Sequence, residues 1–221
     1  MIEHSCEQRS TAWFDLRMGV PTTSEFGCLV TPTGKPSTQY KDYAYRLANE
    51  LFLGGGDPDE FEGNLWTLRG AEVEEQAVQW YEFITGQKVK PVGFVTDDAK
   101  TVGCSPDGMI GETGLLEIKC LKAVNHTAAR VGFSETGEPP LKYKPQCQGQ
   151  MMVTGRKWVD LLFYHPRLDP FFVRVEPDKE FVAMLGNQLK DVQKLRDDAL
   201  EIMRGKKAAL KSQQEAPQCQ D

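Results

Sequence analysis

The spacing of apolar residues changes along the chain, from a helical period in the first part to a strand period further on. Up to residue 85 apolar residues recur every three or four positions, which predicts amphipathic helices. These expected helices cover residues 10–18, with Ser10 as the N-cap, 39–53 and 69–85. Thr22 and Glu25 have the spacing of a capping box and predict another helix start. Two prolines and a glycine predict a loop over 31–38.

Beyond Gly86 the pattern alternates between apolar and polar residues, as expected for strands. The expected strands cover residues 89–96, 101–105, 115–120, 159–164 and 171–175. A helix over about 143–154, with Pro145 in its first turn, separates the third and fourth strands. A long amphipathic helix follows Asp178. Helices followed by strands with intervening helices predict an α/β or α+β domain, with a central mixed β-sheet flanked by helices.

Length and composition fit a single folded unit. The chain has 221 residues, 40% of them hydrophobic, and we expect one domain over 1–204 with a catalytic core at about 69–175. The polar segment 205–221 is expected to be a flexible tail. No apolar run approaches the roughly 20 residues of a membrane span and the N-terminus is polar, so we expect a cytoplasmic protein without membrane contact.

Charge and cysteine content narrow the candidate chemistry. The 26 basic and 32 acidic residues give a net charge of −6, which argues only weakly against a nucleic-acid partner, because an acidic total can hide a basic groove. The six cysteines include no C-x-x-C pair, so a zinc or iron–sulfur site is not expected from them. The chain has only three histidines, so a histidine metal site or a serine–histidine triad is not expected.

The segment 101–120 carries the most informative polar residues. Alternation along a strand places Glu117 and Lys119 on one face, opposite an apolar face that must point to the core. Asp107 lies between Pro106 and Gly108, where a bend can aim its carboxylate at the neighbouring strand. The turn at 112–114 makes the two strands a hairpin. The other interpretation is an exposed hairpin with an ordinary Glu–Lys pair.

Two converging carboxylates form a hard-oxygen pocket suited to Mg²⁺ or Mn²⁺. Such an ion can polarise a phosphoryl oxygen and lower the pKa of a bound water. Lys119 would orient or deprotonate that water and shield the charge of the transition state. Glu74, at the flank of the apolar stripe of helix 69–85, would need a partner: either a divalent ion or, at the rim, an arginine.

Several motifs, in the same order along the chain, resemble a known group of nucleases. They are Trp13 to Gly19, Thr22 to Glu25, Arg69 to Glu74, Ser105-Pro106-Asp107-Gly108, Leu116-Glu117-Ile118-Lys119, Gln146-Cys147-Gln148 and Tyr164-His165-Pro166-Arg167. Together they run from about residue 8 to about 175 and resemble the PD-(D/E)xK nuclease superfamily. Within it, the chain most resembles the lambda-exonuclease family of YqaJ-like viral recombinases.

The resemblance implies a restriction-endonuclease-like core and an activity. That activity is Mg²⁺-dependent digestion of linear double-stranded DNA from 5′ to 3′, leaving a 3′ single strand for recombination by annealing. Two Mg²⁺ ions per site, with Mn²⁺ as a substitute, a homotrimeric ring around DNA and a single-strand annealing protein as partner are also implied.

The resemblance also assigns roles to residues of this chain. Glu74, Asp107, Glu117 and the Ile118 carbonyl match the metal ligands, and Lys119 matches the catalytic lysine. Arg17 matches a residue near a 5′-phosphate pocket. Candidate hydroxyl donors to that pocket are Thr22, Ser24 and Ser105. Gln146 and Gln148 match a glutamine motif near the site, although helical spacing turns Gln148 away from the face that Gln146 shares with Gln150.

Two other functions use the same residues differently. An endonuclease of the restriction or junction-resolving type shares the Asp and Glu-x-Lys site but cuts closed circular duplex. A DNA-binding recombination scaffold would have a dead site, which the intact Glu74, Asp107, Glu117 and Lys119 oppose.

Overall fold

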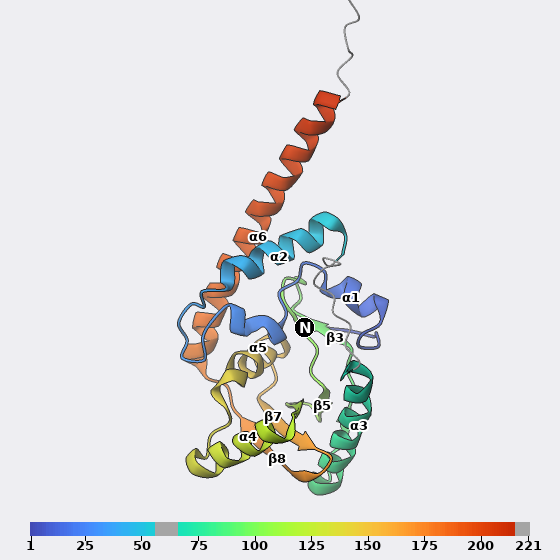
Figure 1. The fold of residues 1–221 in the computed structure, drawn as a ribbon, viewed down its shortest axis with the longest axis vertical. Coiled ribbons are helices and arrows are strands. Elements are labelled where there is room, and N and C mark those ends of the chain that lie inside the picture. The colour runs from blue at the N-terminus through green and yellow to red at the C-terminus, as the bar shows by residue number, and fades with distance from the viewer. Residues whose placement is uncertain (56–65, 215–221) are drawn as a thin grey trace, which may run out of the picture.

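The structure is a computed structural model that describes residues 1–55 and 66–214, with backbone only for 66–72 and 206–214. Its centre is a five-stranded mixed sheet in the order β2-β5-β6-β7-β8 (Figure 1). These strands are β2 Val89–Lys90, β5 Gly108–Ile110, β6 Gly114–Cys120, β7 Trp158–His165 and β8 Leu168–Val175. Only β6 and β7 pair in parallel among the described strands of this sheet, and the other pairs are antiparallel. The predicted hairpin of β5 and β6 is confirmed.

A second, three-stranded sheet has the order β1-β3-β4. Its strands are β1 Ile2–His4, β3 Phe94–Thr96 and β4 Gly103–Cys104. The strand predicted over 89–96 is therefore two strands in different sheets. Pro91, which has no N–H to donate, lies between β2 and β3 and interrupts the ladder. The three-residue strand β1 was not predicted, because it carries too little periodicity, and no bounds were predicted for β5, the first strand of the hairpin.

The helices cover both faces of the large sheet. In chain order they are α1 Thr11–Arg17, η1 Thr23–Cys28, α2 Tyr40–Leu53, α3 Trp66–Thr85, α4 Ala123–Thr136, η3 Leu141–Tyr143, α5 Lys144–Thr154 and α6 Lys179–Gln214. The Ser10 cap is confirmed, since its hydroxyl accepts from the Trp13 amide. Helix α4 was not predicted, because only His126 and Ala129 of its residues are buried and its apolar stripe is weak. No described helix is long and apolar enough to span a membrane.

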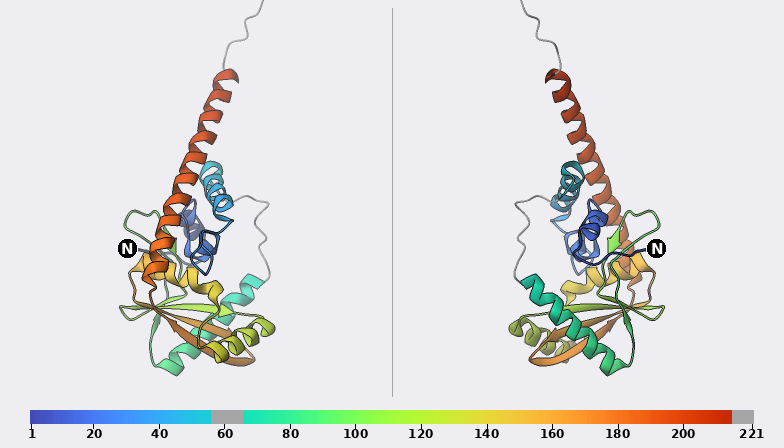
Figure 2. Two further views of the ribbon diagram at one scale, coloured as in Figure 1. Left: turned by 90° about the vertical axis from the view of Figure 1, so that its left-hand side faces the viewer. Right: turned by 90° about the vertical axis from the view of Figure 1, so that its right-hand side faces the viewer.

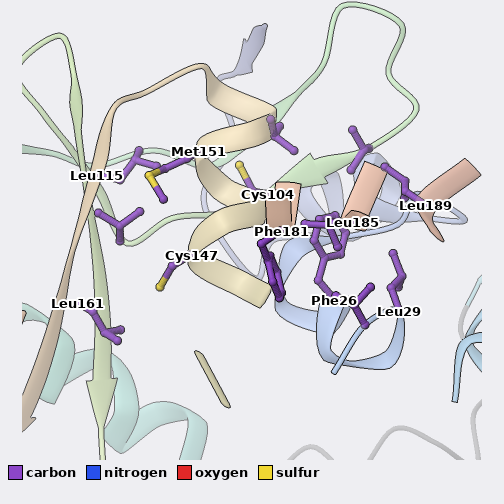
Figure 3. Close-up of a cluster of buried hydrophobic side chains, with 14 of the residues drawn as sticks. Phe26, Leu29, Cys104, Leu115, Cys147, Met151, Leu161, Phe181, Leu185 and Leu189 are labelled. Atoms are coloured by element: carbon purple, nitrogen blue, oxygen red, sulfur yellow. The ribbon is translucent and has the colours of Figure 1, made fainter. Parts of the chain in front are cut away.

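Strand β6 is buried on both of its faces. Leu116 and Ile118 pack against Ala77 and Tyr81 of α3. Leu115 faces the larger core, to which α5 contributes Cys147 and Met151 and α6 contributes Phe181 and Leu185 (Figure 3). The alternative interpretation, an exposed hairpin, is therefore wrong, because α5 covers the face that carries Glu117.

Helix α6 lies against α2 and then continues away from the rest of the chain (Figure 2). Its packing residues include Leu189, Val192 and Leu200. Residues 205–214 continue this helix, and residues 215–221 lie outside the described residues. The division into a domain over 1–204 and a tail stays a prediction.

Helix α5 reaches its place through a close approach to η1 at Gly149. A Cβ added to Gly149 would lie 2.4 Å from Phe26 Cδ2, closer than real Cβ contacts allow. We expect Gly149→Ala to lower the free energy of unfolding by about 1–3 kcal/mol, because the core would be overpacked. The measurement is the urea midpoint of the purified variants.

The matched control is Gly132→Ala in α4, where nothing lies within 4 Å of an added Cβ. This change should stabilise the protein by up to about 1 kcal/mol, since alanine favours helix. Equal midpoints for the two variants would contradict the close packing of α5 on η1.

Candidate active site

Asp107 extends the hydrogen-bond ladder beyond the end of β5. Its amide donates to the Leu116 carbonyl at 3.1 Å, and its Oδ2 accepts from the Ile118 amide at 2.5 Å. The N–H and C=O of one strand residue point to the same side, so the Ile118 carbonyl also points past the end of β5. Asp107 and the Ile118 carbonyl therefore lie on the same side of β6, past the end of β5.

Glu117 reaches toward α5, and both of its carboxylate oxygens accept hydrogen bonds. Its Oε1 accepts from Lys119 Nζ at 2.7 Å and from Gln146 Nε2 at 2.6 Å. Its Oε2 accepts from Gln150 Nε2 at 2.5 Å. Gln146 Oε1 in turn accepts from Lys119 at 2.8 Å, which closes a triangle of three side chains. Glu117 is 4% exposed, so these donors hold a buried carboxylate in one orientation.

Two members of this environment were not assigned a role from the sequence. Gln150, one helical turn after Gln146, was placed on the same face but not in the site, and the i, i+4 spacing was the signal that could have found it. Tyr143 places its ring centroid 5.1 Å from Lys119 Nζ. No sequence pattern pointed to this contact, which depends on the turn η3 before α5.

Gln148 does not reach this cluster, and its assignment to the site is corrected. It is 2% exposed. Its Nε2 donates to the Glu176 carbonyl and its Oε1 accepts from the Asp178 amide, both at 2.8 Å. It therefore links α5 to the segment between β8 and α6. A helix turns by about 100° per residue, so Gln148, two residues after Gln146, points to the opposite side of α5.

The charges of this cluster shift one another's protonation. Burial and repulsion from Glu117 raise the pKa of Asp107 well above its usual range. Burial by itself would lower the pKa of Lys119, but attraction and hydrogen bonding to Glu117, with Asp107, outweigh it and raise that pKa. Lys119 is therefore an ammonium at neutral pH in this arrangement, suited to shielding negative charge.

Glu74 lies at the rim of a cavity of about 630 Å³, together with Asp107 and Ile118. Its Oε1 is 3.2 Å from Arg9 Nη2, and the side chain is 37% exposed. The arginine partner that the sequence left open for Glu74 is thus present. Within the described residues, no three His, Cys, Asp or Glu side chains gather as a metal-binding group.

The donor chemistry at the edge of β6 nevertheless fits a divalent cation. Burial, together with repulsion from Glu117, disfavours the charged form of Asp107 and raises its pKa. The Ile118 carbonyl adds a neutral oxygen, and all three donors are the hard oxygens that Mg²⁺ prefers. A cation between the carboxylates would relieve the repulsion that the fold imposes.

Arg17, Thr22, Ser24 and Ser105 come together around Trp13. The Arg17 guanidinium lies 4.0 Å from the Trp13 ring centroid and donates to Thr22 Oγ1 at 3.3 Å. Thr22 Oγ1 is 3.4 Å from Ser24 Oγ. Trp13 Nε1 donates to Ser105 Oγ at 2.8 Å. Burial lowers the pKa of Arg17.

Thr22 is not the expected capping-box residue. Its side chain makes no cap hydrogen bond to η1, and its hydroxyl faces Arg17 instead. Glu25, the other half of the expected box, pairs with Arg46 at 2.8 Å. Long-range partners have outcompeted the local cap.

Cys104 connects this arginine cluster to the carboxylates. Its thiol is fully buried, and burial and Glu117 raise its pKa while Arg17 opposes the rise. Both charged groups are therefore within electrostatic range of one buried atom. Thr22 forms a β-bridge with Gly103, and both β4 and η1 contact α5, so the two clusters lie on neighbouring elements.

Comparison with known proteins agrees with this architecture. The family model of the YqaJ-like viral recombinase domain matches residues 12–157. The crystal structure of an alkaline exonuclease from Laribacter hongkongensis is 30% identical, with a TM-score of 0.78, and the match covers 91% of this chain and 100% of that one. The same values hold for that protein in complex with dAMP. No curated protein matches the chain.

A more distant structure agrees in fold alone. It is a phage-related exonuclease from Haemophilus somnus 129PT, which is 17% identical with a TM-score of 0.65. That match covers 83% of this chain and 96% of the other. The predicted nuclease fold is thereby confirmed.

In protein without bound metal, the ionised Asp107 carboxylate should lower the free energy of unfolding at neutral pH. Its raised pKa means that the folded state holds the proton more tightly than the unfolded chain, so stability falls as pH rises above about 4. We expect Asp107→Asn, whose amide oxygen can still accept from Ile118, to melt above wild type at pH 7 in EDTA. The difference should shrink near pH 4, and thermal melts at both pH values measure it.

Asp178→Asn is the control of opposite sign. Hydrogen bonding to Lys144 lowers the pKa of Asp178, so its carboxylate stabilises the fold above about pH 4. This variant should melt below wild type at pH 7. An Asp107→Asn protein that melts at or below wild type at pH 7 would contradict the repulsion between Asp107 and Glu117.

Proposed function

The chain belongs to the YqaJ-like viral recombinase domain family, and we propose that it digests linear double-stranded DNA from 5′ to 3′. Family membership and the match to an alkaline exonuclease identify a deoxyribonuclease of the lambda-exonuclease type. The product would be a 3′ single strand for recombination by annealing. The observation that carries the proposal is the contact of Asp107 with β6, where Glu117 and Lys119 are hydrogen-bonded to each other.

The proposed cofactor is Mg²⁺, at two ions per site, with Mn²⁺ able to replace it. Asp107, Glu117 and the Ile118 carbonyl would hold it, with Glu74 at the rim once Arg9 releases that carboxylate. Bound there, the metal supplies Lewis-acid polarisation of the scissile phosphate and a lowered pKa for the attacking water.

The residues of the chain divide the remaining work. The Lys119 ammonium shields the charge that builds on the phosphate in the transition state, and its raised pKa keeps it charged. Gln146 and Gln150 fix the Glu117 carboxylate, so its orientation does not have to be set during the reaction. Gln146 also accepts from Lys119, so one amide orients both catalytic groups.

Arg17 is proposed to bind the 5′-terminal phosphate. A planar guanidinium next to the Thr22, Ser24 and Ser105 hydroxyls offers several donors to the oxygens of one phosphate. Stacking on Trp13 limits the movement of the guanidinium.

Assembly and partner follow from family membership as proposals. A homotrimeric ring would enclose the duplex and keep the enzyme on DNA by topology, which suits a chain with a net charge of −6. The partner would be a single-strand annealing protein of the same recombination system. The alternative activity, cleavage by an endonuclease, uses the same carboxylates without the Arg17 pocket.

The function is tested on linear duplex labelled at either the 5′ or the 3′ end. With Mg²⁺, the 5′ label should be released early and the 3′ label should remain on long single strands; without Mg²⁺ neither should change. Glu117→Gln, which keeps the side-chain size and one acceptor oxygen but removes the charge, should abolish release of the 5′ label. Cutting of closed circular duplex, or early release of the 3′ label, would contradict the proposal.

Arg17→Ala should narrow the rate difference between 5′-phosphorylated and 5′-hydroxyl ends. The cause is the loss of a charge-assisted hydrogen bond worth about 1.5–3 kcal/mol, or roughly ten- to a hundredfold. Arg17→Lys keeps the charge but loses the planar fork, so its preference for 5′-phosphorylated ends should lie between those of the wild type and Arg17→Ala. Initial rates on the 5′-phosphorylated and 5′-hydroxyl substrates measure the effect. An unchanged preference in Arg17→Ala would place the phosphate elsewhere.

A further inference from the structure

Arg9 is held at the cavity rim in a conformation that non-glycine residues rarely adopt. Its φ is 69°, and among the described non-glycine residues only Lys100 shares a positive φ. The residues on either side are anchored. Gln8 donates to the carbonyls of Val92 and Pro106 at 2.9 and 3.1 Å. Ser10 donates to the Glu7 carbonyl at 2.6 Å and caps α1.

This backbone conformation places the Arg9 guanidinium beside Glu74. Strain that the neighbours enforce is typical of positions where a side chain must be aimed. Here the Arg9 guanidinium is aimed at Glu74, 3.2 Å away, while the Arg9 side chain stays 44% exposed. Arg9 is therefore bound to Glu74 and at the same time partly exposed in the cavity.

The cavity has an excess of negative charge that a DNA strand would have to meet. Five acidic side chains line it: Glu3, Glu7, Glu74, Glu75 and Asp107. Of the described basic residues, Arg9 and Lys90 line it, and Lys90 is paired with Glu3 at 2.7 Å. A phosphate backbone entering this cavity is repelled unless cations compensate the acids. Arg9 is the cation of this cavity that pairs with Glu74, one of the proposed metal ligands.

We propose that Arg9 exchanges partners during the reaction cycle, pairing with Glu74 in the free protein and with a backbone phosphate of bound DNA. The proposal rests on the proposed function, because Glu74 is freed for the metal in the second state. A guanidinium on Glu74 competes with a divalent cation for the same carboxylate. A phosphate draws the guanidinium away and so couples DNA binding to metal binding.

This exchange predicts effects of opposite sign for one substitution. Arg9→Gln removes the competing charge and should strengthen Mg²⁺ binding to the DNA-free protein several-fold, as measured by calorimetry on metal-depleted enzyme. The same change should weaken duplex binding about three- to thirtyfold, measured with Ca²⁺ in place of Mg²⁺. The slope of log K against log salt should become shallower by about one, because one phosphate contact is lost.

Two further variants separate charge from other causes. Arg9→Gly also removes the charge but relieves the backbone strain, so it should repeat both binding effects while unfolding at a higher urea concentration. Lys88→Gln removes a cation paired with Glu82 at the far end of α3 and should change neither affinity.

The outcomes distinguish the inference from the proposed function. Mg²⁺ and DNA affinities in Arg9→Gln and Arg9→Gly that equal those of wild type would overturn the exchange. Weakening of both affinities would also overturn it, because Arg9 would then support the metal rather than compete with it. A wild-type protein that binds DNA but shows no Mg²⁺ binding would instead contradict the metal-dependent function.

Discussion

The carboxylate of Glu117, buried in the middle of the central sheet, is the constraint on which the rest of the site depends. A buried charge is costly unless donors surround it, and here Lys119, Gln146 and Gln150 all donate to it. Two of the three donors come from α5. The position of α5 therefore decides whether Glu117 is a stabilised, oriented carboxylate or an unpaired buried charge.

The fold meets this requirement by packing α5 tightly between the sheet and η1. Cys147 and Met151 face the sheet from α5, and Gly149 allows Phe26 to approach from the other side (Figure 3). The segment that forms η1 also carries Ser24 and follows Thr22, so the same contact brings the Arg17 cluster next to the carboxylates. One packing arrangement thus assembles both halves of the site.

How much the sequence could predict depended on whether the signal was local. Alternation placed Glu117 and Lys119 together on β6, and helical spacing separated Gln148 from Gln146. The split of 89–96 between two sheets and the pairing of Glu25 with Arg46 depend on contacts distant in sequence, which periodicity does not carry. Arg9 was missed for the same reason, since its significance comes from a backbone angle and a partner 65 residues away.

The most direct test of this account is a double-mutant cycle on Mg²⁺ binding. Calorimetry would compare the wild type with Asp107→Asn, Glu117→Gln and the double variant. If the two carboxylates hold one ion between them, either single change should remove most of the affinity and the double change should add little more. Losses that simply add, or an affinity that neither change affects, would contradict a shared site at the edge of β6.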